Sequence, residues 1–299
     1  MEQITKTDEK ITNPILNNPY EESLYHYDTD VDGNLDYGNI QLGRRPYKTE
    51  INIQNNSGKS QQALFAGSDL YKGVDPDAYF INTMRSEVKK WRESGYQHAT
   101  RITRDLLNFW FNNTERQNFQ KLFFCQREAV ETAVYLNEIA SHDPNVGRSL
   151  LHQLESRQQS MSAEYESVLP RTAFKMATGT GKTVVMAMLI LYNYINKKEY
   201  PQDTRFADHF LLVAPGITIR DRLGVLLPDT ENHDNDRKDY YTAMYLVPNN
   251  HKHWLDGLRS DITITNYHTF EPKVFQGKKA SPMDGKVGGN GGKERQNSS

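Results

Sequence analysis

The residues best suited to chemistry form one short run, M-A-T-G-T-G-K-T, from Met176 to Thr183. A short apolar stretch, Thr172 to Lys175, precedes this run, and a helix-patterned stretch, Val184 to Ile195, follows it. Glycines let the backbone curl so that successive N–H groups point inward, and the first turn of the next helix adds unpaired donors. The order of strand, loop and helix therefore predicts a loop that cradles phosphate groups.

The side chains of this loop match the parts of a nucleoside triphosphate. Gly179 and Gly181 let the backbone approach the β-phosphate, although Met176 stands where the usual pattern has a small residue. Lys182 would place its ammonium between the β- and γ-phosphates and Thr183 would bind Mg²⁺, so these two are the expected catalytic residues. The alternative is a Gly/Thr-rich loop without a ligand. The residues expected to hold the nucleotide are Thr178, Gly179, Thr180, Gly181, Lys182 and Thr183.

Composition narrows the classes of protein to consider. The chain has 299 residues, of which 36% are hydrophobic, so part of it is expected to be loop or tail rather than core. The net charge is -2, so any contact with nucleic acid must come from local clusters of Lys and Arg. Cys125 is the single cysteine, which excludes an internal disulfide and indicates a reducing compartment. The sequence has neither a membrane-spanning stretch nor a signal-peptide core, so we expect a cytoplasmic protein without membrane contact.

The elements that must position the loop divide the chain into five segments. Residues 1–75 form a polar leader with short hairpins, and residues 76–140 form a helical segment. Residues 141–170 are expected to be a polar connector, in the form of a helix or a loop. Residues 171–270 contain the nucleotide-binding lobe, and residues 271–299 are expected to be a mobile polar tail.

One run in the leader has two interpretations. Asp28 to Asp36 begins like a calcium-binding loop, with Gly33 at the sixth position. However, Asn39 stands where a bidentate glutamate should close the coordination sphere, and neither flank has helical periodicity. A β-hairpin with a tight Asp-Gly turn fits the run better, and a calcium site is the alternative.

Apolar residues recur at helical spacing in three places before the loop. The spacing predicts one helix from Asp77 to Gly95, a second from Thr100 to Phe111 and a third after Cys125. The side chains expected to face the core are Phe80, Met84, Val88, Trp91, Ile102, Leu106, Phe109, Trp110, Ala129, Val130, Ala133, Val134 and Leu136.

Two apolar runs beyond the loop predict buried parallel strands. They are Asp208 to Pro215, which ends in Pro-Gly, and Asp261 to Thr265. Together with the expected strand at Thr172 to Lys175 and the intervening helices, they follow the βαβ plan of a parallel-sheet nucleotide-binding domain.

These motifs, taken in order, resemble the first half of a superfamily-two helicase motor. More narrowly, they resemble the Res subunit of type III restriction enzymes and related DEAD/DEAH-like helicase-nucleases. The leader runs N-P-Y-E-E (Asn18 to Glu22) and G-R-R-P (Gly43 to Pro46) also resemble the leader of that group. The motor motifs are F-F-C-Q-R-E-A-V-E-T (Phe123 to Thr132), M-A-T-G-T-G-K-T, L-L-V-A-P-G-I-T-I-R-D-R-L (Leu211 to Leu223) and T-I-T-N-Y-H-T-F (Thr263 to Phe270).

The resemblance implies a fold and a cofactor. The fold is α/β: a P-loop, RecA-like parallel sheet, here an incomplete first motor lobe, preceded by a small hairpin-rich leader and a helical segment. The cofactor is ATP with Mg²⁺. Gln126 matches the glutamine that reads the adenine edge by paired hydrogen bonds, and a surface glutamine near a helix N-terminus is the alternative. Phe123 stands where many relatives have an arginine.

The resemblance also implies contacts with DNA at the ends of the two later strands. In such motors these segments grip the phosphate backbone of one strand through main-chain N–H groups and a hydroxyl, contacts that carry no sequence information. Ordinary strand-to-helix turns with solvated arginines are the alternative. The residues so implied are Pro215, Gly216, Thr218, Thr265, Asn266 and Tyr267. Arg220 is expected to bind DNA with them, and both Arg220 and Arg222 would add positive charge there.

Hydrolysis needs further groups that the sequence does not supply in the expected place. A carboxylate must hold Mg²⁺, another must orient the attacking water, and an arginine must come from a second lobe. Beyond Phe270 the acidic residues are Glu271, Asp284 and Glu294, and none follows an apolar run. We therefore expect the N-terminal part of an ATP-dependent DNA translocase or helicase of a type III-like restriction endonuclease, truncated and deficient in hydrolysis on its own.

Partners and rival functions follow from the same reasoning. The resemblance implies double-stranded DNA and a modification (methyltransferase) subunit as partners, and RNA stays open as the tracked strand. A non-catalytic, nucleotide-dependent DNA-binding module acting with a partner chain is the main alternative. A small-molecule phosphotransferase would need an acceptor pocket and a lid arginine, which we do not identify.

Overall fold

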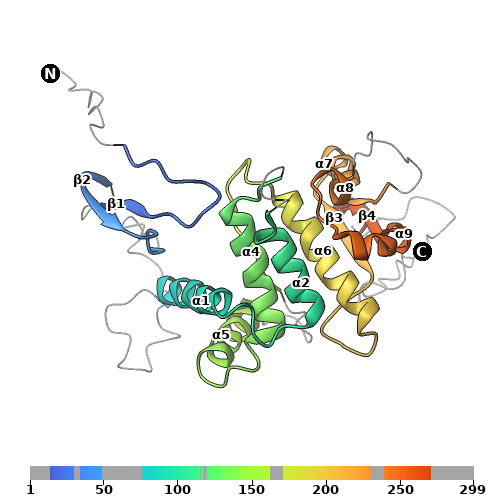
Figure 1. Ribbon diagram of the computed structural model, residues 1–299, viewed down its shortest axis with the longest axis horizontal. Helices are drawn as coiled ribbons and strands as arrows, with labels where there is room; N and C mark the ends of the chain where they lie inside the picture. Colours follow the sequence, from blue (N-terminus) through green and yellow to red (C-terminus); the bar gives the residue numbers. More distant parts are fainter. Residues whose placement is uncertain are drawn as a thin grey trace, which may run out of the picture.

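The computed structural model describes residues 14–29, 34–48, 76–114, 116, 120–161, 171–229 and 239–270. The fold is mixed α/β. In Figure 1, helices α4, α2 and α6 stand side by side at the centre, with α1 and α5 on one side and the strands β3 and β4 on the other. The leader hairpin, β1 and β2, lies at the far left of that view.

The centre is helical because apolar side chains recur every three or four residues. α1 (Pro76–Glu93) buries the four residues that its spacing predicts, and Asp77 lies in its first turn. α2 (Arg101–Phe111) begins after Thr100, whose hydroxyl accepts a hydrogen bond from the Thr103 N–H group. Ile102, Leu106 and Trp110 are buried as predicted, whereas Phe109 is only partly covered.

The other central helices surround the predicted phosphate loop. α4 (Phe124–Val134) continues into a π-helical turn, η3 (Tyr135–Ile139), and the predicted connector contains α5 (Val146–Met161). α6 (Lys182–Glu199) follows the loop directly and is buried along most of its length. None of the helices in the described ranges is both long enough and apolar enough to cross a membrane.

A buried carboxylate joins α1 to α4. Glu131 is fully buried and accepts hydrogen bonds from Arg92 Nε at 2.8 Å, from Arg127 Nε at 2.8 Å and from the Tyr96 hydroxyl at 2.7 Å. Burial, and then the negative charge of Glu131, raise the pKa of Tyr96, so this phenol stays protonated and acts as a donor. Because each oxygen of Glu131 has partners, the network holds the two helices in a fixed relation.

The helical centre is tied to the later half of the chain by the end of α2. The Trp110 indole N–H donates to the Leu246 carbonyl at 2.7 Å. Arg116 is fully buried and donates to the carbonyls of Met244 and Tyr245 at 2.9 and 3.2 Å. Burial, which removes water from the guanidinium, lowers the pKa of Arg116 to about 10.

The two predicted strands beyond the loop are present and parallel. β3 (Phe210–Ala214) pairs with β4 (Ile262–Asn266), from Phe210 opposite Ile262 to Ala214 opposite Asn266. One face is less buried than predicted, since Leu211 and Val213 are 58% and 46% exposed. Short helices connect the strands or follow β4: α7 (Ile217–Arg222), η4 (Leu223–Leu226), α8 (Tyr240–Ala243), η5 (Asn249–Trp254), α9 (Leu255–Leu258), η6 (Arg259–Asp261) and η7 (Tyr267–Thr269).

The leader contains the hairpin that the sequence predicts. β1 (Tyr25–Thr29) and β2 (Leu35–Leu42) are antiparallel, with Tyr25 opposite Leu42. The middle of the calcium-like run, residues 30–33, lies outside the described residues, so the structure shows its two flanks as strands and nothing of its turn.

The strand predicted at Thr172 to Lys175 is wrong. Residues 171–177 form no strand and are mostly exposed, with Phe174 37% exposed. A strand is stable only when a neighbouring strand takes up its N–H and C=O groups, and neither sheet of the described residues includes this segment. Within the ranges described, the parallel sheet therefore has two strands and is not a complete RecA-like sheet.

Candidate nucleotide and nucleic-acid site

The predicted phosphate loop has the backbone shape that its glycines suggest. Gly179 and Gly181 have φ values of +80° and +76°, a region that favours glycine. The Lys182 ammonium and the Thr180 hydroxyl both donate to the Ala177 carbonyl, at 2.8 and 2.7 Å, so both side chains reach across the loop. The loop is thus a tight bend with a lysine directly over it.

The start of α6 leaves donors available at this bend. Gly181 is the N-cap residue and provides no side-chain cap, while its carbonyl accepts from the Val184 N–H group at 2.9 Å. The N–H groups of Lys182 and Thr183 belong to the first turn, where a helix has no internal acceptors for them. Lys182 is exposed and Thr183 is partly buried at the same end, so the bend combines main-chain donors, a positive charge and a hydroxyl.

Met176 does not obstruct this bend. Its side chain is partly buried and packs against the hydrophobic core rather than remaining at the surface with Thr178 and Gly179. The departure from the usual small residue is therefore accommodated by core packing, and the loop keeps its shape.

Gln126 lies against the loop from the first turn of α4. Its side chain is 3% exposed, and its Oε1 atom accepts a hydrogen bond from the Phe123 N–H group at 2.9 Å. Its Nε2 atom faces the backbone of Gly181 so closely that a Cβ atom on that glycine would lie 2.1 Å away. The structure therefore brings Gln126 and the phosphate loop together, although 55 residues separate their positions in the sequence.

The ends of β3 and β4 also meet. Because the strands are parallel and in register, Pro215 and Gly216 leave the sheet beside Asn266 and Tyr267. Thr218 is exposed in the first turn of α7, and Tyr267 is 56% exposed. The two segments that the sequence associates with DNA therefore form one edge of the molecule.

Several polar groups at this edge are already engaged locally. The Arg220 guanidinium donates two hydrogen bonds to the carboxylate of its neighbour Asp221, at 2.8 and 3.0 Å. The negative charge of Asp221 therefore weakens the attraction of Arg220 for a phosphate group. The Asn266 side chain accepts from the Thr269 N–H group, and the Thr265 hydroxyl donates to the Thr269 hydroxyl. Arg222 is exposed and meets no carboxylate among the residues that the structure describes, so it is the better placed cation for a phosphate contact.

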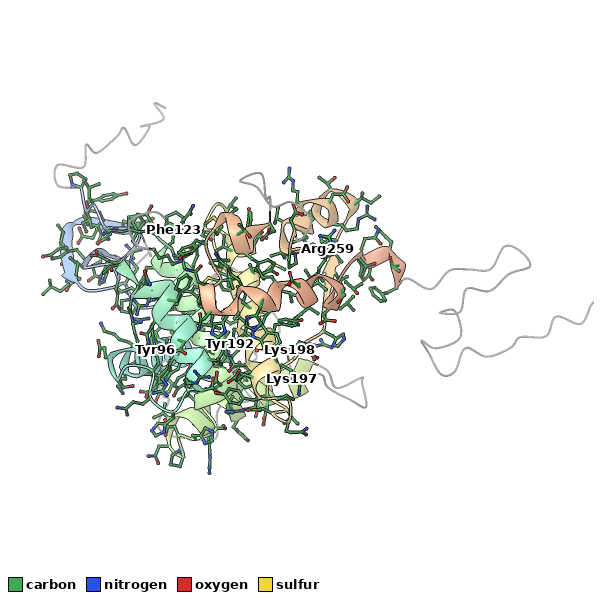
Figure 2. The ribbon with its side chains drawn as sticks, turned by 45° about the vertical axis from the view of Figure 1, so that its right-hand side comes forward. Tyr96, Phe123, Tyr192, Lys197, Lys198 and Arg259 are labelled. Atoms are coloured by element: carbon green, nitrogen blue, oxygen red, sulfur yellow. The ribbon has the colours of Figure 1, made fainter. Side chains whose placement is uncertain are left out.

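The leader contacts this site in a way that sequence reasoning missed. Figure 2 labels Phe123, which lies beside the leader. The Pro19 carbonyl accepts a hydrogen bond from the Phe124 N–H group at 2.9 Å, and Arg44 forms an ion pair with Glu128 on α4. The leader motifs N-P-Y-E-E and G-R-R-P contain the residues that make these contacts. Their composition, however, does not show which part of the chain they contact.

Comparison with known proteins identifies the family of the chain. The model of the family described as "Type III restriction enzyme, res subunit" matches residues 121–287, which is more than half of the chain. The chain belongs to this family, whose helicase-like domains use ATP in type III restriction enzymes. No curated protein and no solved structure matches the chain.

Proposed function

We propose that this chain binds ATP and a DNA strand as part of the ATP-dependent DNA translocase of a type III-like restriction endonuclease. One observation carries the proposal: the bend at residues 176–183, with Lys182 across it, opens directly into the first turn of α6. Main-chain donors and an ammonium in this arrangement suit the β- and γ-phosphates of a nucleotide. Family membership supports the same assignment.

The nucleotide would contact residues from two helices. Residues 178–183 would surround the phosphates, and the Thr183 hydroxyl would bind the accompanying Mg²⁺. Gln126 reaches the same loop from α4 and would donate to and accept from the adenine edge. We assign residues 171–270 to the ATP-binding lobe of a RecA-like motor on this basis.

A DNA strand would lie along the edge formed by the ends of β3 and β4. The main-chain groups of Pro215 to Thr218 and of Thr265 to Tyr267 lie beside one another there, and Arg222 adds a positive charge. Such contacts reach phosphates rather than bases, as movement along any sequence requires. A modification methyltransferase subunit would supply the recognition of a DNA sequence in the complete enzyme.

The main alternative is a non-catalytic module that binds DNA in response to nucleotide and acts with a partner chain. Both functions require ATP and DNA to bind. They differ in hydrolysis, because a motor that works alone would need a carboxylate that orients the attacking water.

Nucleotide binding is tested by titrating the protein with ATP and Mg²⁺ and comparing Lys182→Ala with Lys175→Ala. Lys182 reaches across the loop, whereas Lys175 is exposed just before it. Loss of one charge-assisted contact with a phosphate should weaken ATP binding by roughly 10- to 100-fold in Lys182→Ala. Lys175→Ala should bind as the wild type does. Equal affinities for all three proteins would refute the assignment of the loop.

DNA binding is tested by fluorescence anisotropy with a labelled oligonucleotide. Arg222→Ala should lower the affinity and make its dependence on salt less steep, because one fewer phosphate is neutralised. Arg104→Ala is the matched control, since Arg104 is an exposed arginine on the distant α2. If Arg104→Ala weakens binding as much as Arg222→Ala does, the strand ends are not the DNA site.

A further inference from the structure

We propose that the leader holds the first turn of α4 and so fixes Gln126 against the phosphate loop, which makes Tyr20 and Arg44 positioning residues for the choice of nucleotide. The inference rests on the proposed nucleotide function and concerns how adenine is selected. Both residues come from the leader motifs. Tyr20 contacts the residue just before α4 and Arg44 contacts α4 itself, both within one turn of Gln126.

The first contact is at the N-terminal end of α4. The Phe124 N–H group, one of the donors that a helix cannot satisfy internally, donates to the Pro19 carbonyl at 2.9 Å. The neighbouring Tyr20 ring stacks on the Phe123 ring, with centroids 5.3 Å apart and planes at 22°. The leader therefore provides both a cap and an aromatic contact at the residue before the helix.

The second contact lies one turn further along α4. Arg44 forms an ion pair with Glu128, and its guanidinium lies 5.9 Å from the centre of the Phe124 ring. The Glu128 side chain is only 17% exposed, so the pair is partly shielded from water. Arg85 approaches the same carboxylate at 4.0 Å, and burial together with the charge of Arg44 lowers the pKa of Arg85.

The leader is itself anchored to a different helix. Glu22 receives a hydrogen bond from the Lys89 ammonium on α1 at 2.9 Å. The α1 helix is in turn fixed to α4 through Arg92 and Glu131. The leader is thus braced against two helices whose relation is already fixed, and its contacts can hold the end of α4 in place.

Gln126 lies between the two leader contacts. Its Oε1 atom accepts from the Phe123 N–H group, so the orientation of its amide depends on the residue that Tyr20 covers. Its Nε2 atom faces Gly181 in the phosphate loop. Reading a base edge by paired hydrogen bonds requires an amide with a fixed plane, and freedom of this side chain would cost binding entropy.

This arrangement separates selection of the base from binding of the phosphates. The leader contacts are made to α4, whereas Lys182 and the glycines belong to the loop and α6. Loosening the leader should therefore lower the preference for ATP over GTP and leave the affinity for inorganic triphosphate unchanged. A merely destabilising change would instead lower all three affinities together.

The experiment measures the dissociation constants of ATP, GTP and inorganic triphosphate for Tyr20→Ala and Arg44→Ala. Loss of one oriented hydrogen bond to the base should reduce the ratio of ATP to GTP affinity by about five- to tenfold. Tyr20→Phe keeps the stacked ring and Arg44→Lys keeps the charge, so both should stay near the wild-type ratio. Arg45→Ala is the matched control, because Arg45 bonds the Tyr27 carbonyl within the leader rather than α4.

The outcomes distinguish this inference from the proposed function. Wild-type selectivity in both alanine variants, together with lost selectivity in Gln126→Ala, would overturn the role of the leader alone. Absence of nucleotide binding by the wild type would overturn the proposed function itself. If Tyr20→Ala fails to fold, the comparison of Arg44→Ala with Arg44→Lys decides, since a lysine retains the ion pair with Glu128.

Discussion

At the scale of single residues, Gly181 meets two requirements at once. Its φ of +76° is a conformation that residues with a Cβ atom adopt at a cost. A Cβ atom there would also lie 2.1 Å from the Gln126 amide nitrogen, which is too close for any native contact. The same glycine therefore shapes the phosphate loop and admits the glutamine side chain.

The adjacent glycine of the loop separates these two effects. Gly179 has a φ of +80°, but a Cβ atom at this position would meet no atom of the described residues within 4 Å, so Gly179→Ala meets only the backbone cost. We expect Gly179→Ala to lower the free energy of unfolding by about 1 kcal/mol. Gly181→Ala should lower it by roughly 1 to 2 kcal/mol more, because Gln126 must also move. Urea unfolding measures both, and equal losses would show that the contact with Gln126 carries no energy.

At the scale of elements, α4 connects the leader to the nucleotide loop. Its first turn contacts the leader and Gly181, and its later residues contact α1 through Glu131. In Figure 2, Tyr96 and Tyr192 lie in the interior, well away from Phe123 at the leader end of this helix. The position of α4 is therefore fixed by contacts at both ends, with the leader at its first turn and with α1 at Glu131.

The carboxylate at the centre of this network should be costly to remove. Glu131→Gln keeps the volume but leaves Arg92 and Arg127 without their shared charge, and both arginines are largely buried. We expect a loss of about 2 to 4 kcal/mol in the free energy of unfolding. Glu87→Gln is the control, because Glu87 pairs with the exposed Lys90. The unfolding midpoint of the Glu87→Gln variant should stay close to that of the wild type. A similar midpoint for both variants would mean that the network contributes little.

His251 should make stability depend on pH. It is 8% exposed in η5, and burial lowers its pKa below the usual 6.5. Between the two pKa values, the unfolded chain binds a proton at His251 that the folded chain does not bind. The contribution of neutral, buried His251 to the free energy of unfolding is therefore complete above the pKa of the unfolded state, and it is lost as the pH falls from 7 toward 5. His251→Gln should make the free energy of unfolding depend less on pH between 7 and 5. The control variant His253→Gln, at an exposed histidine, should keep the pH dependence of the wild type. Denaturant unfolding at a series of pH values measures the difference.

Local pattern and long-range contact explain what could be predicted. The helix from Pro76 to Glu93 and the strands β3 and β4 were predictable because their periodicity or apolar content lies within a few residues. The absence of a strand at Thr172 to Lys175 could not be predicted, because a strand forms only with a partner strand and local sequence does not specify that partner. The contact of Pro19 with Phe124 joins residues about a hundred positions apart, and no local pattern specifies it.

At the scale of the whole molecule, the candidate sites lie at one end of the helical centre. The leader passes the N-terminal end of α4, the phosphate loop precedes the N-terminal end of α6, and α7 lies near the same end (Figure 1). Nucleotide and DNA bound at these places would therefore be neighbours. Under the proposed function, both binding sites of the motor would therefore lie in one continuous region of the described residues.

Binding alone does not provide turnover. Attack on the γ-phosphate needs a carboxylate that orients water and a positive charge that meets the developing negative charge. Beyond β4 the acidic residues of the sequence are Glu271, Asp284 and Glu294, and none follows an apolar run of the sequence. We therefore expect this polypeptide, assayed alone with ATP and Mg²⁺, to show no turnover that DNA stimulates. Phosphate release with and without DNA, for the wild type and for Lys182→Ala, measures this directly. A DNA-stimulated rate that disappears in Lys182→Ala would show that the catalytic carboxylate lies elsewhere in these 299 residues, and would favour an active motor over the non-catalytic module.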